Sequence, residues 1–95
     1  MKNLSSVKEV MYLKSFEDYV KPELLNWLVS RTKENKISVS VNENFDPEKK
    51  IWDGELFIDF MEQPILTDVV NNCIGNAYAD EISMENNKKI RLWWD

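Results

Sequence analysis

Carboxylates are the reactive side chains that the sequence gathers most densely. Residues 51–87 contain no Lys or Arg, and they hold eight acidic residues: Asp53, Glu55, Asp59, Glu62, Asp68, Asp80, Glu81 and Glu85. Two carboxylates alone can act as general acid and base, as they do in glycosidases. An enzyme of that kind needs a substrate-sized cleft lined by Asp53 and Asp59, and a sheet of a few short strands offers little cleft for a sugar chain.

The residue types needed for other kinds of catalysis are missing from the sequence. The chain has no histidine, so it has neither a histidine base nor a Ser-His or Cys-His pair. Cys73 is the only cysteine, and it falls in an apolar stripe where core packing is the expected role. Residues 42–53 have oxygen-bearing side chains at calcium-loop spacing, but Pro47 replaces the glycine that the turn requires. We therefore expect no enzyme, no cofactor and no metal site.

The balance of charge favours a protein partner over a nucleic acid. The chain has 12 basic and 17 acidic residues and a net charge of −5. Phosphate contacts need Lys and Arg, so we expect no direct binding to nucleic acid, whereas a basic protein is a suitable partner.

Length and composition predict a single domain over residues 1–95 that does not enter a membrane. The 95 residues leave no room for a second core, and they contain no apolar run long enough to span a bilayer. The sequence begins without a signal peptide, and a lone cysteine makes no internal disulfide. These features predict a cytoplasmic protein, and the abundance of Asn and Lys suggests a bacterial or phage source.

Apolar spacing predicts three helices. Residues 4–20 fit a helix loosely, and a short strand over residues 7–13 is the alternative. Pro22 suits the first turn of a second helix, which ends near Asn35. The third helix is expected over residues 64–82, because apolar pairs recur there every four residues.

Alternating apolar and polar residues predict three strands, which cover residues 37–42, 52–61 and 88–94. The order of elements is then α-α-β-β-α-β. A strand–helix–strand unit implies a right-handed crossover, which would place the last strand parallel to the second. Because the strands alternate, helices are expected on one face only. The predicted fold is an α+β two-layer domain with a small three-stranded mixed sheet.

The uncovered side of this sheet is the expected binding surface. The alternation that buries Trp94 turns Trp93 outward, and Phe57 lies outward between Glu55 and Asp59. Aromatic rings among polar groups are typical of an interface anchor with a polar rim. The candidate partner-binding residues are Trp52, Asp53, Glu55, Phe57, Asp59, Glu62 and Trp93.

Two structural alternatives account for the same residues without a partner. Residues 4–20 could fold across the open face and bury both rings. Asp59 opposite Arg91 or Lys89 could be only a cross-strand ion pair.

Two functions are compatible with these features. The first is an acidic protein-binding domain that neutralises a basic target, such as a nuclease toxin or a nucleic-acid-binding defence protein. Bacterial immunity proteins and phage-encoded inhibitors of host defence are similar in size and charge, although no motif here matches them. The alternative is a self-associating adaptor domain that forms a homodimer through its final strand, which would then lie at a sheet edge.

Overall fold

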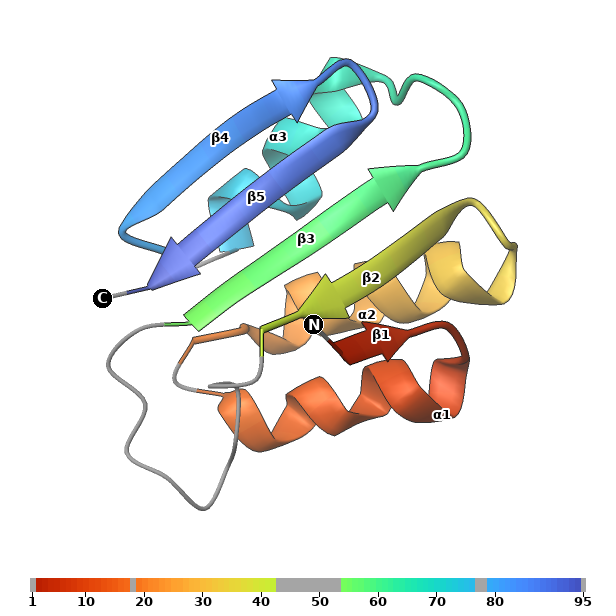
Figure 1. The fold of residues 1–95 in the computed structure, drawn as a ribbon, viewed down its shortest axis with the longest axis vertical. Helices are drawn as coiled ribbons and strands as arrows, with labels where there is room; N and C mark the ends of the chain where they lie inside the picture. Colours follow the sequence, from red (N-terminus) through yellow and green to blue (C-terminus); the bar gives the residue numbers. More distant parts are fainter. Residues whose placement is uncertain (1, 18, 43–53, 77–78, 95) are drawn as a thin grey trace.

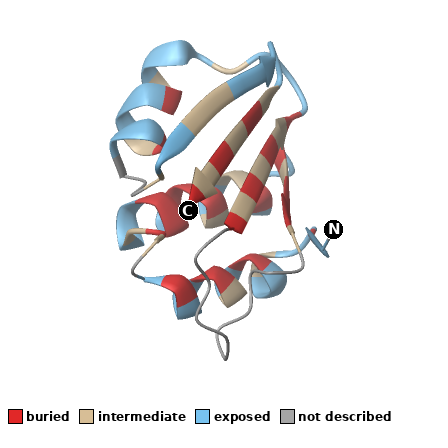
Figure 2. Cartoon of the chain, turned by 60° about the vertical axis from the view of Figure 1, so that its left-hand side comes forward, coloured by how far each residue is buried: buried red, intermediate tan, exposed pale blue. Residues whose placement is uncertain are grey.

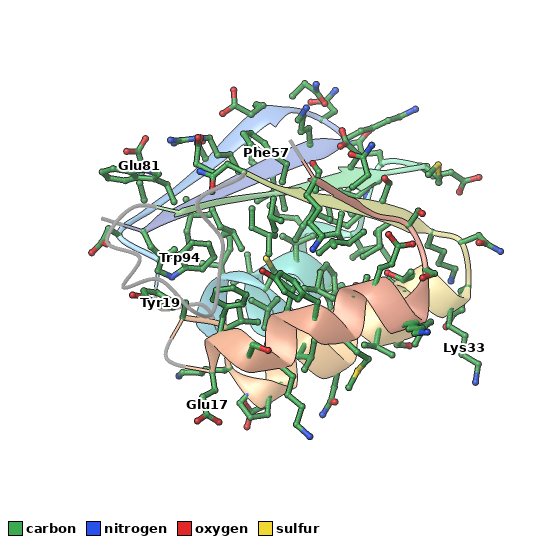
Figure 3. All side chains as sticks on the ribbon, turned by 60° about the horizontal axis from the view of Figure 1, so that its bottom comes forward. Glu17, Tyr19, Lys33, Phe57, Glu81 and Trp94 are labelled. Carbon is green, nitrogen blue, oxygen red and sulfur yellow. The ribbon has the colours of Figure 1, made fainter. Side chains whose placement is uncertain are left out.

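The computed structural model describes residues 2–17, 19–42, 54–76 and 79–94 of the chain. In this part the chain forms two layers, a five-stranded sheet with order β1-β2-β3-β5-β4 and helices packed against one of its faces (Figures 1 and 3). Each strand is antiparallel to its neighbours. The strands are β1 (Lys2–Leu4), β2 (Ile37–Val41), β3 (Gly54–Phe60), β4 (Glu81–Asn86) and β5 (Lys89–Trp94).

The helical layer consists of short helices, and residues typical of a helix start stand at the beginning of two of them. Its elements are α1 (Val7–Val10), η1 (Met11–Phe16), α2 (Pro22–Lys33), α3 (Leu66–Asn72) and η2 (Ile74–Asn76), where η marks a 3₁₀ helix. Ser6 caps α1, because its hydroxyl accepts a hydrogen bond of 3.2 Å from the amide of Glu9. Pro22 occupies the first turn of α2, where its missing N–H costs nothing, and Asn35 follows that helix with a φ of 57°.

The core lies between the two layers, and a row of apolar side chains crosses all five strands on its sheet side. The register places Leu4 beside Val39, Val39 beside Ile58, Ile58 beside Ile90, and Ile90 beside Met84. The first four of these side chains are fully buried, whereas Met84 on the outermost strand is 47% exposed. This row holds the strands in register, since a shift of one residue would turn every apolar side chain outward.

The α+β class and the packing of helices on one face are confirmed, but the sheet differs from the predicted one. It has five strands in place of three, and it is antiparallel in place of mixed. The helix predicted over residues 64–82 ends at Asn72, and β4 follows it. Because β4 and β5 form a hairpin, β5 returns antiparallel to β3, and the predicted parallel crossover is wrong.

The first segment and the last strand also lie elsewhere than predicted. Residues 4–20 do not cross the open face, because α1 and η1 bury Val10, Leu13 and Phe16 on the helix side of the sheet (Figure 3). The final strand β5 is not an edge strand, since it lies between β3 and β4. Among the described residues, none of the helices is long and apolar enough to cross a membrane.

Cys73 is packed in the core, and this placement predicts its reactivity. Its side chain is fully buried, and burial raises the pKa of the thiol to about 12. We expect the native protein to resist alkylation by iodoacetamide at neutral pH and to react once it is unfolded in denaturant, because only the thiolate is nucleophilic. Labelling of the native protein at the rate of the unfolded chain would contradict this burial.

The raised pKa of Cys73 also predicts an alkaline loss of stability. The folded state favours the neutral thiol, so this contribution is complete below the unfolded pKa of about 8.5 and is lost as pH rises towards 12. The loss is about 1.4 kcal/mol for each pH unit within that window. The wild type should have a higher free energy of unfolding than Cys73→Ala at neutral pH, and this difference should shrink in the alkaline range. A difference that stays constant with pH would contradict the raised pKa of Cys73.

Candidate interaction surface

The face of the sheet opposite the helices presents two aromatic rings in the middle of a polar surface. In the described residues, no helix or strand covers this face, which we call the open face (Figure 3). Phe57 on β3 lies between Ser40 of β2 and Arg91 of β5. Trp93 on β5 lies between Glu55 of β3 and Glu81 of β4. Both rings are half-buried, so part of each remains accessible.

Two cations on β5 bind three of the surrounding carboxylates. Arg91 Nε donates to Glu55 Oε2 at 2.5 Å, and Arg91 Nη1 lies 3.6 Å from Glu81 Oε1. Lys89 Nζ lies 3.9 Å from Asp59 Oδ1, so Asp59 forms a cross-strand pair with Lys89, one of the two cations named in the alternative that needs no partner. The hydrogen bond that Arg91 donates to Glu55, together with the charges of Glu55 and Glu81, raises the pKa of Arg91 above its usual value. The two cations of β5 therefore pair with carboxylates of both neighbouring strands, β3 and β4.

The same two cations lie over the aromatic rings. Lys89 Nζ is 5.1 Å from the centroid of Phe57, and the guanidinium carbon of Arg91 is 5.8 Å from the centroid of Trp93. Cation–π contacts at exposed sites contribute about 0.5–1 kcal/mol each, which is enough to favour one orientation of a ring. Phe57 and Trp93 are thus held in place before any partner arrives, and less side-chain entropy is lost when one binds.

Carboxylates outnumber cations on the open face. Glu85 adds a fourth acid near Arg91, contributes to its raised pKa, and accepts a hydrogen bond of 3.2 Å from Ser83. The side chain of Glu81 is 58% exposed although it lies near Arg91, so it is accessible to a further cation. The surface therefore combines central aromatic rings with an acidic rim.

The structure brings together four of the seven residues proposed from the sequence. Glu55, Phe57, Asp59 and Trp93 share the open face, as the alternation of their strands predicted. Trp52 and Asp53 lie outside the described residues. Glu62 follows the end of β3, is exposed, and lines a groove between α2 and α3, so it does not belong to this surface.

The groove beside Glu62 has a volume of about 830 Å³, and its lining is a mixture of polar and apolar side chains. Its charged groups bind one another: Arg31 Nη2 lies 3.1 Å from Asp68 Oδ2, and Lys36 Nζ lies 2.9 Å from Glu34 Oε2. Asp68 also accepts a hydrogen bond of 3.3 Å from Trp27 Nε1. Among the described residues, no three acidic or cysteine side chains lie close enough to hold a metal ion. Apart from Glu62, the charged side chains that line the groove are therefore paired with one another.

Sequence reasoning missed the contribution of β4 to the open face. Glu81, Ser83 and Glu85 stand beside β5, but residues 81–82 had been assigned to the end of a helix. A signal was present, because Ile82 and Met84 alternate with these polar residues directly before the turn at Asn86.

Comparison of the chain with protein-family models, with curated proteins and with solved structures finds no match.

Proposed function

We propose that this chain is a non-enzymatic protein-binding domain that docks a basic protein on its open face. The observation that carries this proposal is the pair of half-buried rings, Phe57 and Trp93, each beneath a cation and set among acidic side chains of the open face. Within this class, an inhibitor of the immunity type is favoured, one that neutralises a nuclease toxin or a nucleic-acid-binding defence protein. Such targets carry basic surfaces built for phosphates, and an acidic rim can occupy them.

The aromatic centre supplies binding energy that surface charges alone do not. Residues that dominate binding energy in protein interfaces are enriched in Trp and lie near the middle of the contact, where surrounding polar groups exclude water. Trp93 has Glu55 and Glu81 beside it on the neighbouring strands, and these polar groups would surround its ring in a contact. Burial of its exposed edge by a partner would slow dissociation.

The acidic rim supports the choice of a basic partner. Glu81 and Glu85 belong to β4, which carries no Lys or Arg, and both are exposed. Attraction between such a rim and a basic surface raises the association rate, and salt screens it. Glu55 and Asp59 already bind Arg91 and Lys89, which favours a role in fixing the surface over a role in acid–base chemistry.

Affinity capture of the tagged protein from its native cells tests this function. We expect one basic protein at near-stoichiometric amount, released by a rise in salt, and an inhibitor also predicts that adding the pure chain abolishes the activity of that protein. Capture of the bait alone, or of a partner whose retention is indifferent to salt, would contradict the proposal.

A further inference from the structure

An apolar stripe runs along the outer side of α3 and into η2. Leu66, Val70 and Ile74 follow one another at intervals of four residues, and their side chains are 64%, 43% and 37% exposed. Ile65 and Met61 are also exposed, by 74% and 56%, but they line the groove between α2 and α3. Leu66, Val70 and Ile74 are here called the α3 stripe. The other large apolar side chains that the described residues leave exposed are Ile65, Met61, Met11 and Met84. Figure 2 shows α3 with an exposed outer surface.

The stripe is exposed because other side chains fix the orientation of α3. Val69 and Cys73 bind the helix to the core, and both are fully buried. On the side that faces α2, Asp68 accepts hydrogen bonds from Arg31 and from Trp27. With these two sides fixed, a rotation of α3 that buried Leu66 and Val70 would break the contacts of Asp68. The stripe therefore does not enter the core of its own chain.

We propose that the α3 stripe is the contact surface of a homodimer, in which α3 of one chain packs antiparallel against α3 of a second copy. Contiguous apolar side chains exposed on a protein surface are a mark of an interaction site. A two-fold axis beside Val70 would bring each stripe onto its counterpart. Ridges of residues four apart interdigitate when two helices cross at about −50°, the commonest packing of helices.

The charge pattern favours a second copy over a basic protein as the occupant. Between residues 63 and 76 the only charged side chain is Asp68, and Arg31 neutralises it. A two-fold contact therefore opposes no like charges, whereas a basic partner would find no unpaired carboxylate on α3 itself. Interfaces of homodimers are more apolar and poorer in charge than other interfaces. The flanking Thr67 and Asn71 are uncharged, as such a rim requires.

The neighbouring sheet edge is not included in the contact. Strand β4 is at the edge of the sheet, but its ladder with β5 is interrupted between Met84 and Asn86, and Glu81 and Glu85 lie on it. Bulges and charges are the devices by which proteins prevent pairing of edge strands. A stable interface buries about 800 Å² on each partner, so a contact centred on this short helix is expected to be weak, with a dissociation constant on the order of micromolar.

The oligomeric state of the full chain tests the dimer. Light scattering after gel filtration, or sedimentation equilibrium, would be run from about 1 µM to about 1 mM, a range that spans weak interfaces. We expect the wild type to double its mass as concentration rises, Val70→Glu to stay monomeric, and Met11→Glu to behave as the wild type, because Met11 is 41% exposed but lies on η1. A wild type that is monomeric at the highest concentration, or a Val70→Glu protein that dimerises normally, would overturn the proposal.

A second variant keeps the test decisive if Val70→Glu fails to fold. Val70→Cys places a thiol beside the proposed two-fold axis, so mild oxidation should give a disulfide-linked dimer that circular dichroism shows to be folded. Met11→Cys should give none at the same concentration, and equal cross-linking of the two variants would contradict the proposal. The open face lies on the other side of the sheet, so a monomeric chain could still capture a basic protein, and the two proposals fail independently.

Discussion

Replacing Ile58 by alanine lowers the free energy of unfolding by about 2–5 kcal/mol. Ile58 is fully buried on the central strand β3, with Val39 beside it on β2 and Ile90 beside it on β5. Alanine removes three carbon atoms from the middle of the apolar row, and the facing strands are held by their ladders, so the cavity cannot collapse completely. The loss therefore includes the cost of the cavity as well as the transfer free energy.

Denaturant unfolding followed by circular dichroism measures this effect. Ile58→Val is the matched control, because it removes a single methylene group and should cost about 0.5–1.5 kcal/mol. If Ile58→Ala lowers the free energy of unfolding by less than about 1 kcal/mol, β3 does not occupy the centre of the core.

Replacing Trp93 by alanine weakens the binding of the basic partner about 30-fold or more, which corresponds to about 2 kcal/mol. Trp93 is the largest ring on the open face, and Arg91 holds it in orientation between Glu55 and Glu81. Its removal takes away the apolar centre of the contact and leaves the acidic rim without an anchor. The loss should appear mainly in the dissociation rate.

Surface plasmon resonance or calorimetry with the captured partner measures this loss. Tyr12→Ala is the matched control: Tyr12 is also a half-buried ring beneath a cation, with Lys2 Nζ 4.0 Å from its centroid, but it belongs to η1 in the helical layer. We expect Tyr12→Ala to bind as the wild type does. Equal losses in the two variants, or unchanged binding by a folded Trp93→Ala protein, would remove Trp93 from the interface.

The elements that could be predicted from the sequence are those in which the spacing of apolar residues matches the side chains that the fold buries. Strands β2 and β3 alternate, and the buried side chains Val39 and Ile58 are on the predicted side. Pro22 begins α2 as expected. The same alternation correctly turned Phe57 and Trp93 to the face opposite the core. In these segments, local spacing and tertiary burial agree.

Residues 65–82 show where local spacing is not enough. Apolar pairs at intervals of four predicted one long helix with Leu66, Val70 and Ile74 in the core, but these three side chains are exposed. Of the described residues from α3 to η2, Val69 and Cys73 are the ones that enter the core, because Asp68 holds another side of the helix against Arg31. An interaction between residues so distant in the sequence leaves no mark in the helical pattern.

The edge strands were missed for a related reason. Strand β1 has three residues, of which only Leu4 is buried, and such a segment has no detectable period. Strand β4 is mostly exposed, and its inward pair, Ile82 and Met84, is short enough to be read as the end of a helix. Once β4 is present, its hairpin with β5 reverses the direction of the chain. Because of this reversal, the sheet is antiparallel and β5 lies between β3 and β4.

The central claim is that a basic protein docks on the open face, and a pair of matched charge reversals tests it most directly. One protein carries Glu81→Lys with Glu85→Lys on the open face, and the other carries Glu17→Lys with Glu23→Lys in the helical layer. All four residues are exposed, and the two double variants change the net charge equally. Figure 3 shows Glu17 and Glu81 on opposite sides of the molecule. In affinity capture from the native cells, we predict that the first variant loses the basic partner and that the second retains it. Loss in both would show that only net charge matters, and loss in the second alone would place the binding surface on the helices; either result would contradict the account.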